Sequence, residues 1–398
     1  MKRLVFFIAC LGLLGPAVSN AAKMDTRFYG YVDGYVESVQ DQPGVDNSGA
    51  RTELENSPEF DVPNLHVIVR SNYEDTTAFI NLSGGGAGAV DVRTAWVDKQ
   101  LLGEYLSFRI GELYRPFGLY NLILDAVPTY IGIEPPELFD GDHFLVTRTT
   151  NAMLHGKVNV GGTNFINYAM TTGNDERESD QLPVGLDVNF TMGTTLKAGV
   201  SYYTSGGAAV YNEDNPGGVV RWAEQDKFDV MGLYLQWTDP RWTVQLAGFQ
   251  ASHELVRDTG SGDYGLTTIC SSANLSANSR TRFGCDSTLD SEEDYDVNTW
   301  YLRVGYNFNV GDMGQLVPYF QYDVYENEEV IFDKDFGGDK EAGLADDGKF
   351  TKWTLGTVYR PHPAAAFKID YSQHLQDVQN ESTNYGEIRF SYSYVWRL

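Results

Sequence analysis

The stretch LPVGLDVNFTM, residues 182–192, decides the fold, because its side chains alternate in character along the chain. Its apolar members fall on one face: Val184, Leu186, Val188, Phe190 and Met192. The residues between them are glycine or polar. A helix would repeat its apolar positions every 3.6 residues, so a period of two indicates a β-strand with one apolar and one polar face.

The same alternation recurs through the chain and predicts an all-β fold. We expect about sixteen strands, beginning near Arg27, Pro63, Thr76, Val90, Leu106, Thr149, Thr163, Leu182, Thr195, Lys227, Trp242, Val297, Gln315, Lys349, Ala365 and Tyr385. Short turns alternate with longer connections at 40–62, 115–148, 173–181, 205–226, 254–296, 326–348 and 377–384. One further connection, 84–89, lies on the same side of the barrel as the longer connections but is itself short. An even number of strands with alternating loop lengths is typical of a transmembrane antiparallel β-barrel with periplasmic termini.

A soluble β-sandwich or propeller would also alternate, but its loops need not alternate in length. Tryptophan and tyrosine also lie on the apolar face near the predicted strand ends, which suits the interfacial girdles of a membrane barrel. The residues are Tyr73, Trp96, Tyr202, Trp237, Trp242, Trp300, Trp353, Tyr359 and Trp396. We therefore favour the membrane barrel.

The first 21 residues have the pattern of a secretory signal peptide. Lys2 and Arg3 precede an apolar run at 4–14, and the small residues Ser19 and Ala21 form a cleavage site. Residues 22–398 then form a single barrel domain in the outer membrane. Later in the chain no apolar run reaches the length of a membrane-spanning helix.

The acidic charge is concentrated in the longer connections. The chain of 398 residues carries 29 Lys and Arg against 55 Asp and Glu, a net charge of −26. The longer connections contain 39 of the acids and only 10 of the bases, so strands and turns are close to neutral. An acidic chain repels nucleic acid, and 13% aromatic residues exclude a disordered chain. The acidic loops could also hold divalent cations nonspecifically, beside lipopolysaccharide.

Sixteen strands enclose a water-filled lumen, so the polar face lines a pore. Arg70, Arg93 and Arg109 fall on this face of three early strands. The connection 115–148 (the third loop) is rich in apolar residues and should pack inside the barrel rather than extend into water. Its acids would then face these arginines across a constriction: Asp125, Glu134, Glu137, Asp140 and Asp142.

The segment FRIGELYRPFG, residues 108–118, is similar to the strand end that precedes the third loop in the Gram-negative trimeric porins, including the phosphate-selective porin O and P group. The resemblance covers the whole mature chain in architecture and implies a sixteen-stranded porin of the Gram-negative outer membrane. It also implies that the acids and arginines named above form the pore constriction, and that the barrel-assembly machinery inserts the chain.

Two features depart from that family. The chain ends in Trp396-Arg397-Leu398, where the family usually has phenylalanine. The second loop, 84–89, is too short to latch onto a neighbouring subunit. The sequence therefore leaves open whether the chain forms the homotrimer that the resemblance implies.

The function that these patterns favour is passive diffusion of small hydrophilic solutes and ions, with a modest cation preference from the acidic mouth. One alternative is a substrate-specific channel for phosphate or an organic acid, bound by Arg70, Arg93 and Arg109. Another is a structural or adhesive barrel whose loops bind a partner. No catalytic motif such as H-E-x-x-H, G-x-S-x-G or C-x-x-C occurs, so we expect neither an enzyme nor a cofactor.

Two cysteines remain after the signal peptide, Cys270 and Cys285, both in the 254–296 connection. In an exported protein such a pair most commonly forms a disulfide. Closing so short a loop would restrain it by about 3 kcal/mol in the chain-entropy model. A metal or redox pair is the alternative reading.

Overall fold

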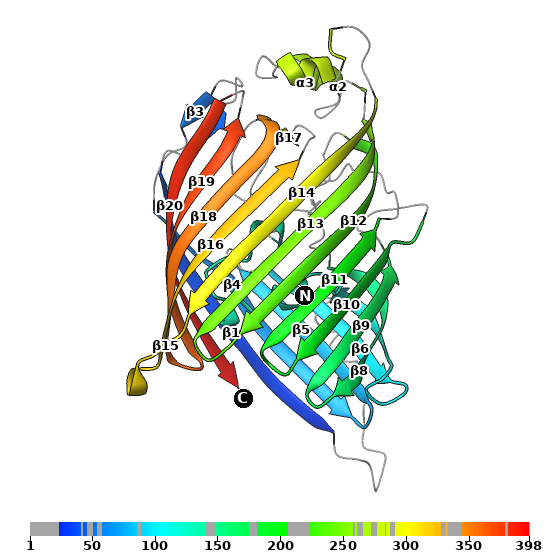
Figure 1. Cartoon of the computed structure of the whole chain (residues 1–398), viewed down its shortest axis with the longest axis vertical. Coiled ribbons are helices and arrows are strands. Elements are labelled where there is room, and N and C mark those ends of the chain that lie inside the picture. Colours follow the sequence, from blue (N-terminus) through cyan, green and yellow to red (C-terminus); the bar gives the residue numbers. More distant parts are fainter. Residues whose placement is uncertain are drawn as a thin grey trace.

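The computed structural model of the chain is a closed antiparallel barrel of sixteen strands (Figure 1). The structure describes residues 24–40, 43–45, 51–53, 58–85, 89–139, 148–174, 181–205, 223–257, 259–260, 266–271, 277–282, 284–286, 291–327, 331–332, 344–378 and 381–397. The expected signal peptide, 1–21, lies outside these residues. No helix in this part of the chain is long and apolar enough to cross a membrane.

The barrel strands begin within a few residues of the expected positions. They are β1 (Asp25–Gln40), β4 (Glu59–Tyr73), β5 (Thr76–Gly85), β6 (Ala89–Gln100), β7 (Ser107–Tyr114), β8 (Arg148–Gly161), β9 (Asn164–Gly173), β10 (Val184–Met192), β11 (Leu196–Thr204), β12 (Ala223–Thr238), β13 (Trp242–Arg257), β14 (Glu292–Tyr306), β16 (Gln315–Asn327), β18 (Leu344–His362), β19 (Ala365–Val378) and β20 (Glu381–Arg397). Each strand pairs with its neighbour in sequence, and β1 closes the barrel by pairing with β20. Figure 1 shows β1 beginning and β20 ending at the same end of the barrel.

Several short elements lie outside the sixteen barrel strands. Two strands, β15 (Phe308–Asn309) and β17 (Ile331–Phe332), add to the barrel sheet, and β2 (Pro43–Val45) pairs with β3 (Arg51–Glu53). The helices α2 (Leu266–Ser271) and α3 (Ala277–Arg282) lie at the end of the barrel opposite to that where β1 begins and β20 ends (Figure 1). The 3-10 turns are η1 (Asn121–Ile123), η2 (Val127–Thr129), η3 (Glu137–Phe139) and η4 (Gly311–Met313).

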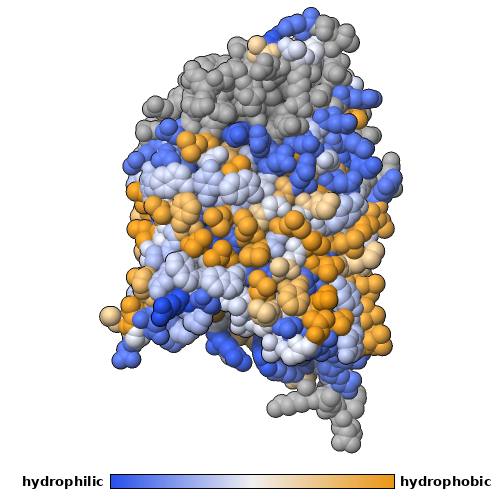
Figure 2. All heavy atoms as spheres, in the orientation of Figure 1, coloured by the Kyte–Doolittle hydropathy of each residue, from blue (hydrophilic) through white to orange (hydrophobic). Residues whose placement is uncertain are grey.

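The burial pattern is the reverse of that in a soluble protein. On β10, Leu186 and Val188 are 41% and 44% exposed, whereas Asp187 between them is 5% exposed. Apolar side chains therefore face outward and polar ones inward, as a barrel in lipid requires. Figure 2 shows the resulting apolar belt, with a paler band above and below it and hydrophilic residues beyond.

One expected girdle residue faces the other way. Between β5 and β6 the register shifts, with Asn81 opposite Thr94 and Leu82 opposite Val92. The extra residue is Arg93, and this β-bulge turns every following side chain of β6 to the opposite face. Trp96 therefore lies in the lumen, stacked on Phe79, and the expectation that it faces lipid is wrong.

Cys270, in α2, and Cys285, beyond α3, form a disulfide with their Cα atoms 5.4 Å apart. The guanidinium of Arg280 in α3 donates to the carbonyl of Cys270 at 2.8 Å. Both cysteines also pack against the buried apolar cluster. The disulfide thus joins the two short helices of this loop into one unit.

Candidate pore constriction

The third loop leaves β7 after Tyr114, and its described part, 115–139, folds into the lumen. Gly118 adopts a φ of +60°, which turns the chain inward, and its amide donates to Ser201 Oγ of β11 at 2.9 Å. The Phe117 ring lies 5.0 Å from the Phe249 ring of β13. Gly232 of β12 makes room for this contact, because a Cβ there would lie 1.9 Å from the Phe249 ring. The expectation of an inward loop is confirmed.

Tyr120 is the central anchor of the loop and is 1% exposed. Its hydroxyl donates to Gln245 Oε1 at 2.5 Å and accepts from Arg303 Nη1 at 2.6 Å. Burial raises the pKa of the Tyr120 hydroxyl, so the group stays protonated and keeps its role as a donor. The loop is therefore held against β13 and β14 by both packing and hydrogen bonds.

Asp125 fastens the loop to the wall formed by β5, β6 and β7. Its carboxylate accepts from Arg93 Nε at 2.9 Å, from Asn81 Nδ2 at 3.1 Å and from the Tyr114 hydroxyl at 3.1 Å. The three donors come from three adjacent strands. Asp125 thus attaches the loop to three adjacent strands of the early wall through one carboxylate.

Glu134 and Glu137 fasten the loop to the late strands instead. Lys352 Nζ of β18 lies 2.9 Å from Glu134 and 2.7 Å from Glu137, and Arg389 of β20 also forms an ion pair with Glu134. The side chains of Lys352 and Glu137 are each 2% exposed. This pairing is consequently a buried ionic cluster rather than a surface contact.

Cations of the late strands also hold the loop by its main chain. Lys368 Nζ donates to the carbonyls of Val127 and Gly132 at 2.7 and 2.8 Å, and Arg360 donates to that of Tyr130 at 2.9 Å. In the opposite sense, the Ile133 amide donates to Asp370 Oδ2 at 3.1 Å. The third loop therefore contacts both the early and the late walls of the lumen.

The structure brings together only one of the expected acid–arginine pairs, Arg93 with Asp125. Arg109 instead pairs with Asp98 of the adjacent strand, and Arg70 contacts no carboxylate among the described residues. Glu134 and Glu137 meet Lys352 and Arg389, so the expectation that they face the early arginines is wrong. Asp140 and Asp142 lie outside the described residues.

The alternation along the strands also predicts Arg303, Lys368 and Arg389 on the lumen face. Two other cations that hold the third loop, Lys352 and Arg360 of β18, were not among the expected lumen residues. Lys352 is a buried lumen residue that precedes the outward Trp353, and Arg360 follows the outward Tyr359. The alternation of side chains along β18 was therefore enough to predict that Lys352 and Arg360 face the lumen. What the sequence lacked was the path of the loop, which decides which inward cations it meets.

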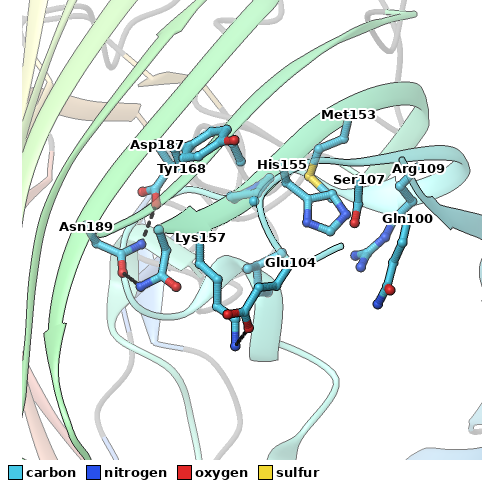
Figure 3. Close-up of a pocket in the computed structure, with 15 residues that line it drawn as sticks. Gln100, Glu104, Ser107, Arg109, Met153, His155, Lys157, Tyr168, Asp187 and Asn189 are labelled. Atoms are coloured by element: carbon cyan, nitrogen blue, oxygen red, sulfur yellow. Dashed lines mark hydrogen bonds and ion pairs between the residues drawn. The ribbon is translucent and has the colours of Figure 1, made fainter. Parts of the chain in front are cut away.

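A cavity of about 360 Å³ lies beneath the loop, against β6 to β10 (Figure 3). Pro116 and Leu122 of the third loop line one part of it. Polar side chains line much of the rest: Gln100, Glu104, Ser107, Arg109, His155, Lys157, Asn167, Asp187 and Asn189. Met153, Gly156, Tyr168 and Ala169 complete the lining. Lys157 pairs with Glu104 at 2.9 Å, and Asn189 donates to Asp187 at 2.9 Å. The space thus combines fixed charges of both signs with hydrogen-bonding amides, which suits polar solutes.

No family model and no curated protein matches this sequence. Solved structures do match over nearly all of its length. An anion-selective porin from Comamonas acidovorans is 13% identical, with a TM-score of 0.58, over 94% of this chain and 100% of that one. The outer-membrane channel DcaP of Acinetobacter baumannii is 10% identical, with a TM-score of 0.57, over 96% and 100%. A trimer form of OmpT from Vibrio cholerae is 11% identical, with a TM-score of 0.56, over 94% and 100%.

These identities are low, so the likeness concerns the fold. The likeness covers nearly the whole chain, which forms a closed barrel with an outward apolar belt and an inward third loop. The chain therefore has the fold of the Gram-negative outer-membrane porins.

Proposed function

We propose that this protein is an outer-membrane channel, not an enzyme, through which small hydrophilic solutes and ions diffuse. The observation that carries the proposal is the third loop, which crosses a polar lumen and is held there by paired charges on both walls. A constriction of this kind favours polar solutes, because an apolar molecule must displace oriented water. The outward apolar belt supports a place in the outer membrane.

We further propose a modest preference for cations, because the longer connections carry most of the acidic residues. In planar bilayers under a potassium chloride gradient, the reversal potential should have the sign of cation selectivity. The preference should weaken at high salt, where charges are screened over about 3 Å at 1 M. A reversal potential of the opposite sign would contradict this charge argument, and the absence of any conductance would contradict the channel itself.

The substrate-specific anion channel is the second candidate. The observation in its favour is Arg109, which lines the cavity beneath the third loop. Saturable block of the ion current by an anion would support this function over simple diffusion.

We also propose that the barrel associates with further copies of itself, as a trimer. Outward tryptophan and tyrosine side chains occur on β12, β13, β14, β19 and β20, including Trp237, Trp242, Trp300, Tyr371 and Tyr392. In the described strands β5 to β8 the outward positions carry none, and aliphatic residues such as Val92, Val97, Ile110 and Leu154 take their place. An outward wall without an aromatic girdle suits contact with protein better than contact with a lipid interface. A trimer form of one structural neighbour is consistent with this assembly.

Cysteine cross-linking tests this assembly. Val97→Cys, on the wall of β5 to β8 that has no outward tryptophan or tyrosine, should give cross-linked oligomers of the membrane-inserted protein. Leu246→Cys, an outward position of similar exposure on β13, is the matched control and should stay monomeric on a gel. Equal cross-linking at both positions would count against the proposed contact face.

A further inference from the structure

Arg109 is held in one orientation beside the cavity. Its Nε donates to Asp98 Oδ2 at 2.8 Å, and its guanidinium lies 4.0 Å from the centre of the Trp96 ring. His155 contacts the same carboxylate oxygen at 2.6 Å. The two terminal nitrogens of Arg109 have no hydrogen-bond partner among the described residues. Such a fixed pair of donors matches the two oxygens of a carboxylate.

The same cavity has an apolar side. Leu122 of the third loop lines it and is 53% exposed, although it lies inside a barrel whose inward faces are polar. Pro116 adds to this side from the same loop. An exposed leucine next to a fixed guanidinium provides contacts for a molecule with one charged and one hydrocarbon end.

The charges around the cavity set a limit on the ligand. Lys157 already pairs with Glu104 (Figure 3), and His155 shares Asp98 with Arg109. Asp187 adds a further carboxylate to the lining. Beyond the terminal nitrogens of Arg109, a second negative charge on a ligand would meet a lysine that is already paired and would be repelled by the Glu104 and Asp187 carboxylates. The lining therefore disfavours a ligand with two negative charges.

We infer that this cavity binds a small monocarboxylate with an apolar chain. The carboxylate accepts hydrogen bonds from the terminal nitrogens of Arg109, and the hydrocarbon chain contacts Leu122. This inference rests on the proposed channel function, since the ligand reaches the cavity through the lumen. A volume of about 360 Å³ accommodates a chain of several carbons.

The test is block of the ion current by a series of straight-chain carboxylates, from acetate to hexanoate, with inorganic phosphate as comparison. In the wild-type barrel, block should tighten with chain length by up to about three- to fourfold per methylene. Arg109→Gln should weaken block by every carboxylate by about tenfold or more. Leu122→Ser should keep acetate block and lose the dependence on chain length.

Arg70→Gln is the matched control, because it removes the same charge from the lumen face at a position that does not line the cavity. Equal loss of block in the Arg70 and Arg109 variants, block by phosphate as tight as by hexanoate, or block independent of chain length would each overturn the inference. Calorimetric titration of hexanoate into the detergent-solubilised full-length barrel gives a second readout. A barrel that conducts without binding hexanoate refutes only this inference, whereas a barrel without conductance refutes the channel.

Discussion

Replacing Asp125 with asparagine is expected to detach the third loop from the early wall and to give larger, noisier single-channel currents. The carboxylate accepts hydrogen bonds from Arg93, Asn81 and Tyr114, one of them from a charged donor. Losing a hydrogen bond to a charged group costs about 1.5–3 kcal/mol. Since each 1.4 kcal/mol is about a factor of ten, the detached loop should become at least about tenfold more populated.

Asp91→Asn provides the control for this prediction. Asp91 lies on β6, the strand of Arg93, and is exposed, and no described residue forms an ion pair with it. Both variants remove one negative charge, but only the Asp125 variant removes an attachment of the loop. Identical current changes in the two variants would mean that charge, and not attachment, sets the current.

Replacing Lys352 with methionine is expected to destabilise the folded barrel by about 3–5 kcal/mol, because it removes one partner of a buried ion pair. Glu137 is the residue most affected, since its side chain is 2% exposed and Lys352 lies 2.7 Å away. Glu134 keeps its ion pair with Arg389. The measurement is reversible unfolding in denaturant of the barrel in lipid vesicles, followed by tryptophan fluorescence.

Lys349→Met serves as the comparison on the same strand. Its side chain is 51% exposed and lies 3.8 Å from Glu326, and exposed pairs of this kind contribute about 0–1 kcal/mol. A loss of stability as large in this variant as in the Lys352 variant would mean that the buried cluster has no special role.

The strands could be predicted from the sequence because a period of two is a local property, visible in stretches such as 182–192. The inward position of the third loop followed from its apolar content. The face of Trp96 could not be predicted, since the bulge at Arg93 adds one residue without any change in the alternation that precedes it. One such residue exchanges lumen and lipid for the rest of the strand.

The partners of the charged residues were the hardest part to predict. Arg109 stands directly opposite Asp98 in the strand register, so a neighbouring carboxylate was available to it without the loop. The sequence alone does not give this register, because it depends on how β6 and β7 pair in the folded sheet. The path of the third loop is also non-local, because its acids meet β18 and β20, which follow it by about two hundred residues. The charge of a residue and its place in the alternation could therefore identify the charged lumen residues, but not which acid pairs with which base.

The attachments of the third loop also have a mechanical consequence. The loop is joined to β6 through Asp125 and to β18 and β20 through Glu134, so it acts as a cross-brace between walls that the sheet alone connects only around its circumference. A thin cylinder under lateral pressure flattens most easily into an ellipse, and a brace across its interior opposes that deformation. We therefore expect the ion pairs that shape the opening also to help the cylinder resist flattening under the sideways pressure of the surrounding lipid.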